Sequence, residues 1–105
     1  MEGCWLGLFD EDGQELLLGN YRRQIMYIGT AVDENGIGVL ENVNDMRFSY
    51  NGEKRSIHYF KIFAGEFGDC PVSPMYEFDK PVNIVCGDTV HIGAESIRVI
   101  LRGSV

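Results

Sequence analysis

The sequence lacks the features of several protein classes, and each absence narrows the fold and the function. Cysteine is scarce: Cys4, Cys70 and Cys86 lie at wide spacings, and no two form a CxxC motif. A secreted disulfide scaffold of this length would have an even and denser set. A zinc site would have to combine these thiols with His58 and His91 without paired ligand spacing. We therefore expect free cysteines that pack as small hydrophobic side chains.

Basic residues are also in short supply. The chain has 9 Lys and Arg against 16 Asp and Glu, a formal charge of -7. Cations neutralise the phosphates of nucleic acids and of anionic membranes, so we expect neither partner. No apolar run approaches the roughly 18 residues that a membrane helix needs. The start, Met1-Glu2-Gly3, has no basic signal-peptide region, so we expect synthesis in the cytosol.

No catalytic or cofactor constellation stands out. A nucleophilic pair would need Cys70 or Cys86 beside a histidine, and no family signature surrounds either cysteine. The run Asp10-Glu11-Asp12 lacks the alternate acids, the central glycine and the final Glu of an EF-hand loop. We interpret it as a solvated hairpin turn, with a weak cation site as the alternative. We expect no enzyme activity, no cofactor and no metal.

The sequence does contain a β-strand pattern along its whole length. Its 105 residues, 45% of them hydrophobic, suffice for one core, and no linker divides them, so we expect one domain over residues 1–105. Apolar and polar residues alternate between turns rich in Gly, Asn and Asp, which favours a sandwich or a barrel. The predicted strands are residues 4–9, 21–28, 37–40, 46–50, 56–63, 75–79, 81–86, 89–92 and 97–102, with 14–18 as a hairpin partner or short loop strand.

Five features lead to more specific expectations. Asn51-Gly52 is the strongest two-residue hairpin signal, so it predicts pairing between the strands on either side. Residues 56–63 are apolar on both faces, which suits a central strand, whereas the brief strand 37–40 suits an edge. Pro81 lacks a backbone donor and should start a strand or lie on an edge. Residues 64–74, rich in Gly and Pro, predict a loop of the kind that makes contacts.

Two groups of side chains are candidates for binding. Arg22 and Arg23 are adjacent, so on a strand they point to opposite faces. At most one of them can face a given partner, such as an acidic residue of a neighbouring strand or chain. The second group is either core or a stacking surface for a glycan. Its members are Trp5, Tyr21, Tyr27, Tyr50, Tyr59 and Tyr76.

Four segments in a fixed order carry a family resemblance. They are Trp5-Leu6-Gly7-Leu8-Phe9, Gly19-Asn20-Tyr21-Arg22-Arg23-Gln24, His58-Tyr59-Phe60-Lys61-Ile62-Phe63, and a closing stretch from Lys80-Pro81-Val82 through Gly87-Asp88-Thr89 and Gly93-Ala94 to residues 97–101. With them the chain resembles, over nearly its full length, a family of small tailed-phage and prophage proteins described as tail-fibre-like or head-tail structural proteins.

The resemblance implies a fold, a role and partners. The fold is a single compact antiparallel β-sandwich of the jelly-roll type. The role is that of a virion structural or attachment protein that performs no catalysis, present in the host cytoplasm before assembly. The partners are further copies of the same chain, for example in a trimer, and other virion proteins. The alternative is a small carbohydrate-binding module that stacks exposed aromatic rings on a host glycan.

Overall fold

The structure is a computed structural model that describes residues 3–16 and 20–100. Every strand pairing in it is antiparallel, and the described residues contain no helix. The prediction of an all-β fold is therefore confirmed. The eight strands, in chain order, are β1 (Gly3–Asp10), β2 (Gln24–Val32), β3 (Gly38–Asn42), β4 (Met46–Ser49), β5 (Arg55–Phe63), β6 (Tyr76–Ile84), β7 (Thr89–Ile92) and β8 (Arg98–Ile100).

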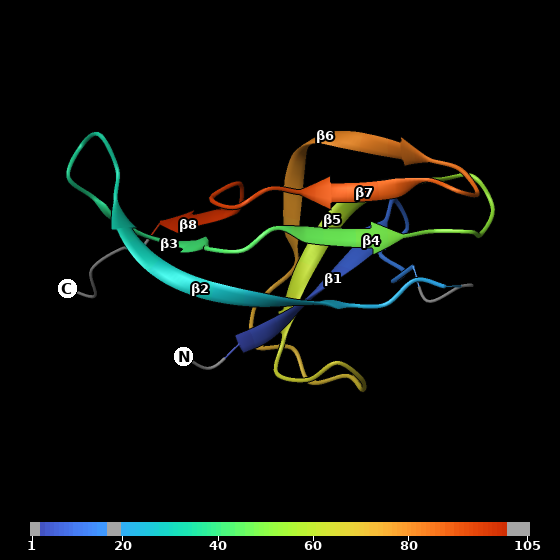
Figure 1. Ribbon diagram of the computed structural model, residues 1–105, viewed down its shortest axis with the longest axis horizontal. Coiled ribbons are helices and arrows are strands. Elements are labelled where there is room, and N and C mark those ends of the chain that lie inside the picture. Colours follow the sequence, from blue (N-terminus) through green and yellow to red (C-terminus); the bar gives the residue numbers. More distant parts are fainter. Residues whose placement is uncertain (1–2, 17–19, 101–105) are drawn as a thin grey trace.

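The strands form a curled large sheet and a small second sheet. The large sheet has six strands in the order β6-β5-β1-β2-β3-β8, and β4 pairs with β7 in the small sheet. In Figure 1 the long β2 curves past β1 and β5, while β4 and β7 lie side by side. The curl turns the large sheet into a half-barrel whose two edges are β6 and β8.

One hydrophobic core lies between the two sheets. Leu6 and Leu8 of β1 and Ile62 of β5 bury their side chains in it from the large sheet. Met46 and Phe48 enter the same core from β4. In β4 these residues alternate with exposed ones, as the period-two pattern of the sequence predicts, whereas residues 6–10 of β1 are buried on both faces. The central position predicted for residues 56–63 is confirmed, because β5 pairs with β1 on one side and β6 on the other.

A long hairpin extends from the half-barrel. Residues 33–36 form its turn, in which the Gly36 N–H donates to the Asp33 carbonyl at 3.0 Å and Gly36 has a φ of 78°. A positive φ suits glycine, which explains its place at this turn. We call residues 30–40 the hairpin arm; Figure 1 shows it projecting at one end of the molecule. The prediction that 37–40 forms an edge is wrong, because β3 lies between β2 and β8.

The hairpin predicted at Asn51-Gly52 is also wrong, since β4 pairs with β7 rather than with β5. A two-residue hairpin turn of that type needs a positive φ at both central positions, and neither Asn51 nor Gly52 has one. Tyr50 explains the different course of the chain. Its side chain is buried and donates to the Glu53 carbonyl, while its backbone exchanges hydrogen bonds with Gly87 and Asp88 at the turn before β7.

Several predicted boundaries change in the structure. The strand predicted over 21–28 begins only at Gln24 and continues to Val32. The strands predicted over 75–79 and 81–86 are one bent strand, β6, whose pairing with β5 is irregular, and Pro81 lies on this edge as expected. Residues 14–16 form only an isolated bridge, Phe9 to Glu15, and 17–18 lie outside the described residues. The same is true of 101–102 in the last predicted strand.

Candidate functional site

A buried ion pair precedes β2. Arg23 donates from Nε to Glu15 Oε2 and from Nη2 to Glu15 Oε1, each at 2.8 Å. Only 6% of the Arg23 side chain and 7% of the Glu15 side chain are exposed. Tyr21 donates its hydroxyl to Glu15 Oε2 at 2.9 Å and accepts the backbone N–H of Leu8 at 2.9 Å. We call Glu15, Tyr21 and Arg23 the ion-pair cluster.

The remaining contacts of Arg23 complete the cluster. Its Nη1 donates to the Gly65 carbonyl at 3.3 Å, and its Cζ lies 3.5 Å from the centre of the Phe63 ring. A bidentate pair with further hydrogen bonds leaves no buried charge uncompensated, which is the condition under which such a pair is tolerated. The cluster thereby connects the segment before β2 with β1 and with the end of β5.

Tyr21 and Arg23 both hold their protons firmly. Burial raises the pKa of the Tyr21 hydroxyl above its ordinary value of 10.0, and the negative charge of Glu15 raises it further. The hydrogen bonds to Glu15 raise the pKa of Arg23. Tyr21 is therefore neutral and Arg23 charged throughout the physiological pH range. Neither group is suited to proton transfer near neutral pH, because an effective acid or base has a pKa near the working pH.

One of the two arginines pairs with an acidic residue, as expected, but neither lies on a strand, because β2 begins only at Gln24. Arg23 is buried on an acidic partner, while Arg22 is exposed. The partner, Glu15, is singled out by no pattern in the sequence. Its segment, residues 14–18, is predicted only as a hairpin partner or a short loop strand.

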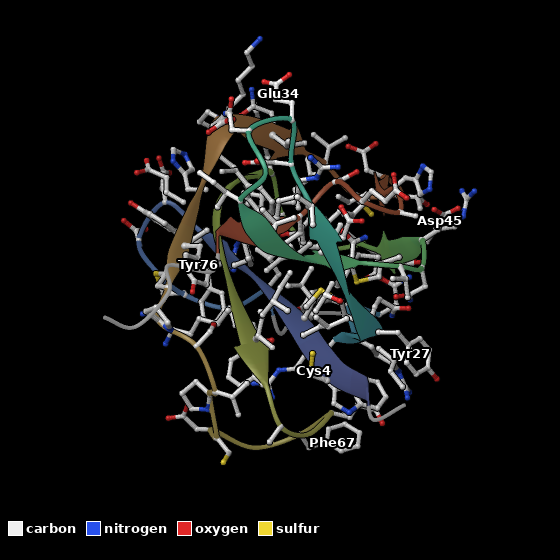
Figure 2. The ribbon with its side chains drawn as sticks, turned by 90° about the vertical axis from the view of Figure 1, so that its left-hand side faces the viewer. Cys4, Tyr27, Glu34, Asp45, Phe67 and Tyr76 are labelled. Carbon is white, nitrogen blue, oxygen red and sulfur yellow. The ribbon has the colours of Figure 1, made fainter. Side chains whose placement is uncertain are left out.

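An open hollow lies beside the ion-pair cluster. It has a volume of about 440 Å³. The Phe67 side chain, at its rim, is 77% exposed, and Figure 2 shows Phe67 on the loop that closes this end of the molecule. Lys61, Glu66 and Asp69 add charges of both signs to the wall. We call this the Phe67 hollow; an exposed ring beside polar groups is an arrangement that suits a sugar.

A second cleft separates the two edges of the half-barrel. It has a volume of about 530 Å³ and takes one wall from β6 and the other from the start of β8. Its lining residues are Phe60, Tyr76, Glu77, Phe78, Asp79, Ser96, Ile97 and Arg98. Figure 2 shows Tyr76 at the β6 side. We call it the β6–β8 cleft; it combines an aromatic wall with two exposed carboxylates.

The three cysteines and His91 differ in their surroundings. Cys4 is half-buried and its thiol donates to the Met26 carbonyl at 3.4 Å, and burial raises the pKa of this thiol. Cys70 and Cys86 are exposed free thiols. His91 Nε2 lies 3.7 Å from Asp45 Oδ2 at the surface. Within residues 3–16 and 20–100, no three His, Cys, Asp or Glu side chains gather in a metal-binding group.

The acidic run after β1 is a turn. Asp10 Oδ1 accepts the backbone N–H groups of Asp12 and Gln14, each at 2.9 Å, and Asp10 Oδ2 lies 3.4 Å from Arg55. Gly13 has a φ of 77°, as a turn of this kind requires. The interpretation as a hairpin turn is confirmed, but only Glu11 and Asp12 are solvated, because Asp10 is the buried last residue of β1. Both carboxylate oxygens of Asp10 already have partners in the backbone and in Arg55, so Asp10 is poorly placed to bind a metal cation as well.

The aromatic candidates divide by burial. Tyr21 and Tyr50 are buried, so their rings are core and offer no stacking surface. The half-buried rings are Trp5, Tyr27, Tyr59 and Tyr76. Phe67, the most exposed large hydrophobic side chain of the described residues, is not among the rings that the sequence singles out. Its position in the Gly- and Pro-rich loop is the signal that points to it.

No helix that is long and apolar enough to cross a membrane occurs in the described part of the chain. A scan against protein-family models and searches of curated proteins and of solved structures found no match to this chain.

Proposed function

We propose that this chain is a structural subunit that works by protein–protein assembly and performs no catalysis, in the manner of the small phage proteins that its sequence resembles. In this proposal its 105 residues form a single domain that resides in the virion after synthesis in the host cytoplasm. Its partners are further copies of itself, for example in a trimer, and other virion proteins. The observation that carries the proposal is the exposure of sheet edges and apolar side chains on so small a fold.

The sheet edges are the first support. The half-barrel ends in β6 and β8, which pair with no further strand among the described residues, and the small sheet consists of β4 and β7 alone. Unpaired edge strands present free backbone donors and acceptors to other chains. Pro81 and the irregular register of β6 limit pairing along its second part, so its first part and β8 are the edges open to another chain.

Exposed apolar side chains are the second support. Val32 of the hairpin arm is 70% exposed, and Ile37 on the opposite side of the turn is exposed as well. Figure 2 shows Glu34, at the tip of the same arm, pointing away from the body of the molecule. An arm that projects apolar residues has no core of its own to bury them in, so a neighbouring chain is the natural place.

The proposal extends to the fold. We infer a jelly-roll-like β-sandwich in which the half-barrel and the β4–β7 sheet are the two layers. In support, Met46, Phe48 and Ile92 of the small sheet belong to the same core as Leu6 and Leu8 of the large one. Side chains from two facing sheets that share one core are typical of a sandwich.

Light scattering after size-exclusion chromatography tests the proposal. We expect a molar mass at least twice the 11.8 kDa of one chain, and we expect this molar mass to fall when the sample is diluted. A stable monomer over the accessible concentration range, with no partner taken from a mixture of the other virion proteins, would count against it.

The Phe67 hollow favours carbohydrate binding as a second candidate. Its exposed ring stands beside Lys61, Glu66 and Asp69, which can donate to and accept from sugar hydroxyls. A glycan array tests this candidate, with a Phe67→Ala variant as the control for any oligosaccharide that binds. No binding by the unmodified chain would remove it.

A further inference from the structure

The β6–β8 cleft is a gap in a sheet rather than a pocket between separate layers. Five antiparallel pairings lead from β6 through β5, β1, β2 and β3 to β8. The two edges therefore run in opposite directions, and the cleft separates them. An added strand that is antiparallel to β6 would be parallel to β8. Since antiparallel pairing is the more common, β6 is the edge that such a strand would extend.

The first part of β6 has two chemically different faces. Tyr76 and Phe78 turn toward the core, where their ring centres lie 5.3 and 4.9 Å from the centre of the Phe60 ring. Glu77 and Asp79 alternate with them and are exposed. Because successive residues of a strand point to opposite faces, a strand laid beside β6 would meet aromatic rings on one face and carboxylates on the other.

The two carboxylates are free to take a cationic partner. The ion pairs found among residues 3–16 and 20–100 include neither Glu77 nor Asp79. Across the cleft, Arg98 donates its Nε to Glu41 at 3.0 Å, and its charge is thereby shared with a carboxylate of β3. Lys80 follows the acidic pair along β6 and is exposed. A chain of net charge -7 offers few cations of its own, so the complementary charge fits a different protein better than a second copy.

We propose that the free edge of β6 binds an extended segment of a partner protein in which apolar residues alternate with Lys or Arg. The segment adds a strand antiparallel to β6. Its apolar side chains enter the β6–β8 cleft against Tyr76, Phe78 and Ile97, and its basic side chains lie beside Glu77 and Asp79. Main-chain hydrogen bonds supply affinity and the alternation supplies specificity, as in other cases of strand addition. This inference rests on the proposed function in that it names one partner class for an assembly subunit.

The test uses the full chain, labelled with ¹⁵N, and a capped peptide Lys-Val-Lys-Ile-Lys-Val-Lys as the probe. We expect amide shifts and slowed hydrogen exchange at residues 76–79. The same peptide with every Lys replaced by Glu should bind at least about tenfold more weakly, because it places like charges beside Glu77 and Asp79. A peptide methylated on the backbone nitrogens that face β6 should lose binding, because it cannot complete the ladder.

A charge reversal in the protein sharpens the test. The double variant Glu77→Lys with Asp79→Lys should weaken the Lys peptide by about tenfold or more and gain affinity for the Glu peptide. The matched control is Glu11→Lys with Asp12→Lys, which makes the same charge change at an exposed turn and should leave both affinities nearly unchanged. Both variants alter exposed side chains, and their ¹⁵N spectra report whether the fold is intact.

The outcomes separate this inference from the proposed function. Equal losses in the two charge-reversed variants, shifts that map away from β6, or full binding of the methylated peptide would overturn strand addition at this edge. A chain that binds the peptide at β6 while remaining a monomer supports the inference and contradicts self-assembly. A chain that forms oligomers but does not bind the peptide supports self-assembly and contradicts the inference about β6.

Discussion

The guanidinium of Arg23 lies above the ring of Phe63, with its central carbon 3.5 Å from the ring centre. The same guanidinium is bonded twice to Glu15, so the arginine joins an ionic contact and an aromatic one at the end of β5. A desolvated arginine on an aromatic face is among the stronger contacts of its kind. Arg23 therefore stabilises the fold, and its charge is not available to bind an external anion.

Arg23→Met should destabilise the protein by about 3 kcal/mol, because it leaves the Glu15 carboxylate buried without its partner. Urea unfolding followed by circular dichroism measures the change. Arg22→Met is the matched control: Arg22 is exposed, and we expect a change within about 0.5 kcal/mol. Equal effects of the two substitutions would show that the ion pair contributes little.

Tyr21 should make the protein sensitive to alkali. The pKa of its hydroxyl is raised in the folded state, so its contribution to stability is complete below the unfolded value of about 10 and declines as the pH rises above it. Tyr21→Phe should lower the unfolding free energy at neutral pH by about 1–3 kcal/mol, since the Leu8 N–H loses its acceptor. The same variant should lose less stability than the unmodified chain between pH 9 and pH 11. Parallel alkaline slopes for the two proteins would contradict the assignment.

Asn42 should be the most sensitive polar residue outside the ion-pair cluster. Its side chain has 0% exposure, donates to the carbonyls of Asn44 and Gly93, and accepts the N–H of Ile97 at 2.8 Å. Asn42→Ala leaves these groups unpaired, at a cost of about 2–4 kcal/mol. Asn35→Ala, at the exposed tip of the hairpin arm, is the control and should cost less than about 1 kcal/mol. Thermal unfolding ranks the two, and a similar Tm for both variants would refute the role given to Asn42.

The three thiols should differ in reactivity. Cys70 and Cys86 are exposed, whereas Cys4 is half-buried with a raised pKa. A disulfide reagent should therefore label two thiols quickly in the folded protein and the third slowly, with the rates converging in denaturant. Rapid labelling of all three would show that β1 opens at its start.

The hairpin arm should contribute to self-association. Val32→Asp with Ile37→Asp adds two charges to an exposed apolar site, which should weaken assembly by about tenfold or more without affecting the fold. Gln14→Glu with Asn51→Asp adds the same charge at two exposed positions outside the arm and the strands and serves as the control. Sedimentation velocity compares the two. Unchanged assembly of the arm variant would place the contact elsewhere.

Strand positions followed from local pattern, and strand partners did not. The strand over 89–92 coincides with β7, and the strand over 56–63 lies within β5, because alternation and turn residues act locally. Pairing depends on distant contacts. Asn51-Gly52 has the composition of a tight hairpin, yet burial of Tyr50 and its bonds to Gly87 and Asp88 outweigh that preference and direct β4 to β7.

The candidate site was predictable only in part for the same reason. Arg23 stood out as one of two adjacent cations in an acidic chain, whereas Glu15 resembles any other surface acid until the fold brings it within 2.8 Å of Arg23. The β6–β8 cleft exists only because the large sheet curls, and no local pattern reports the curl of a six-stranded sheet. The Gly- and Pro-rich loop that carries Phe67 was recognised as a loop from its composition.

The central claim is that the exposed edges and the hairpin arm are contact surfaces for protein, and hydrogen exchange at two widely separated concentrations tests it most directly. The amides of β8 and residues 30–40 should exchange more slowly at the higher concentration, while the amides of β1 and β5 stay unchanged. Identical exchange at both concentrations would contradict the claim.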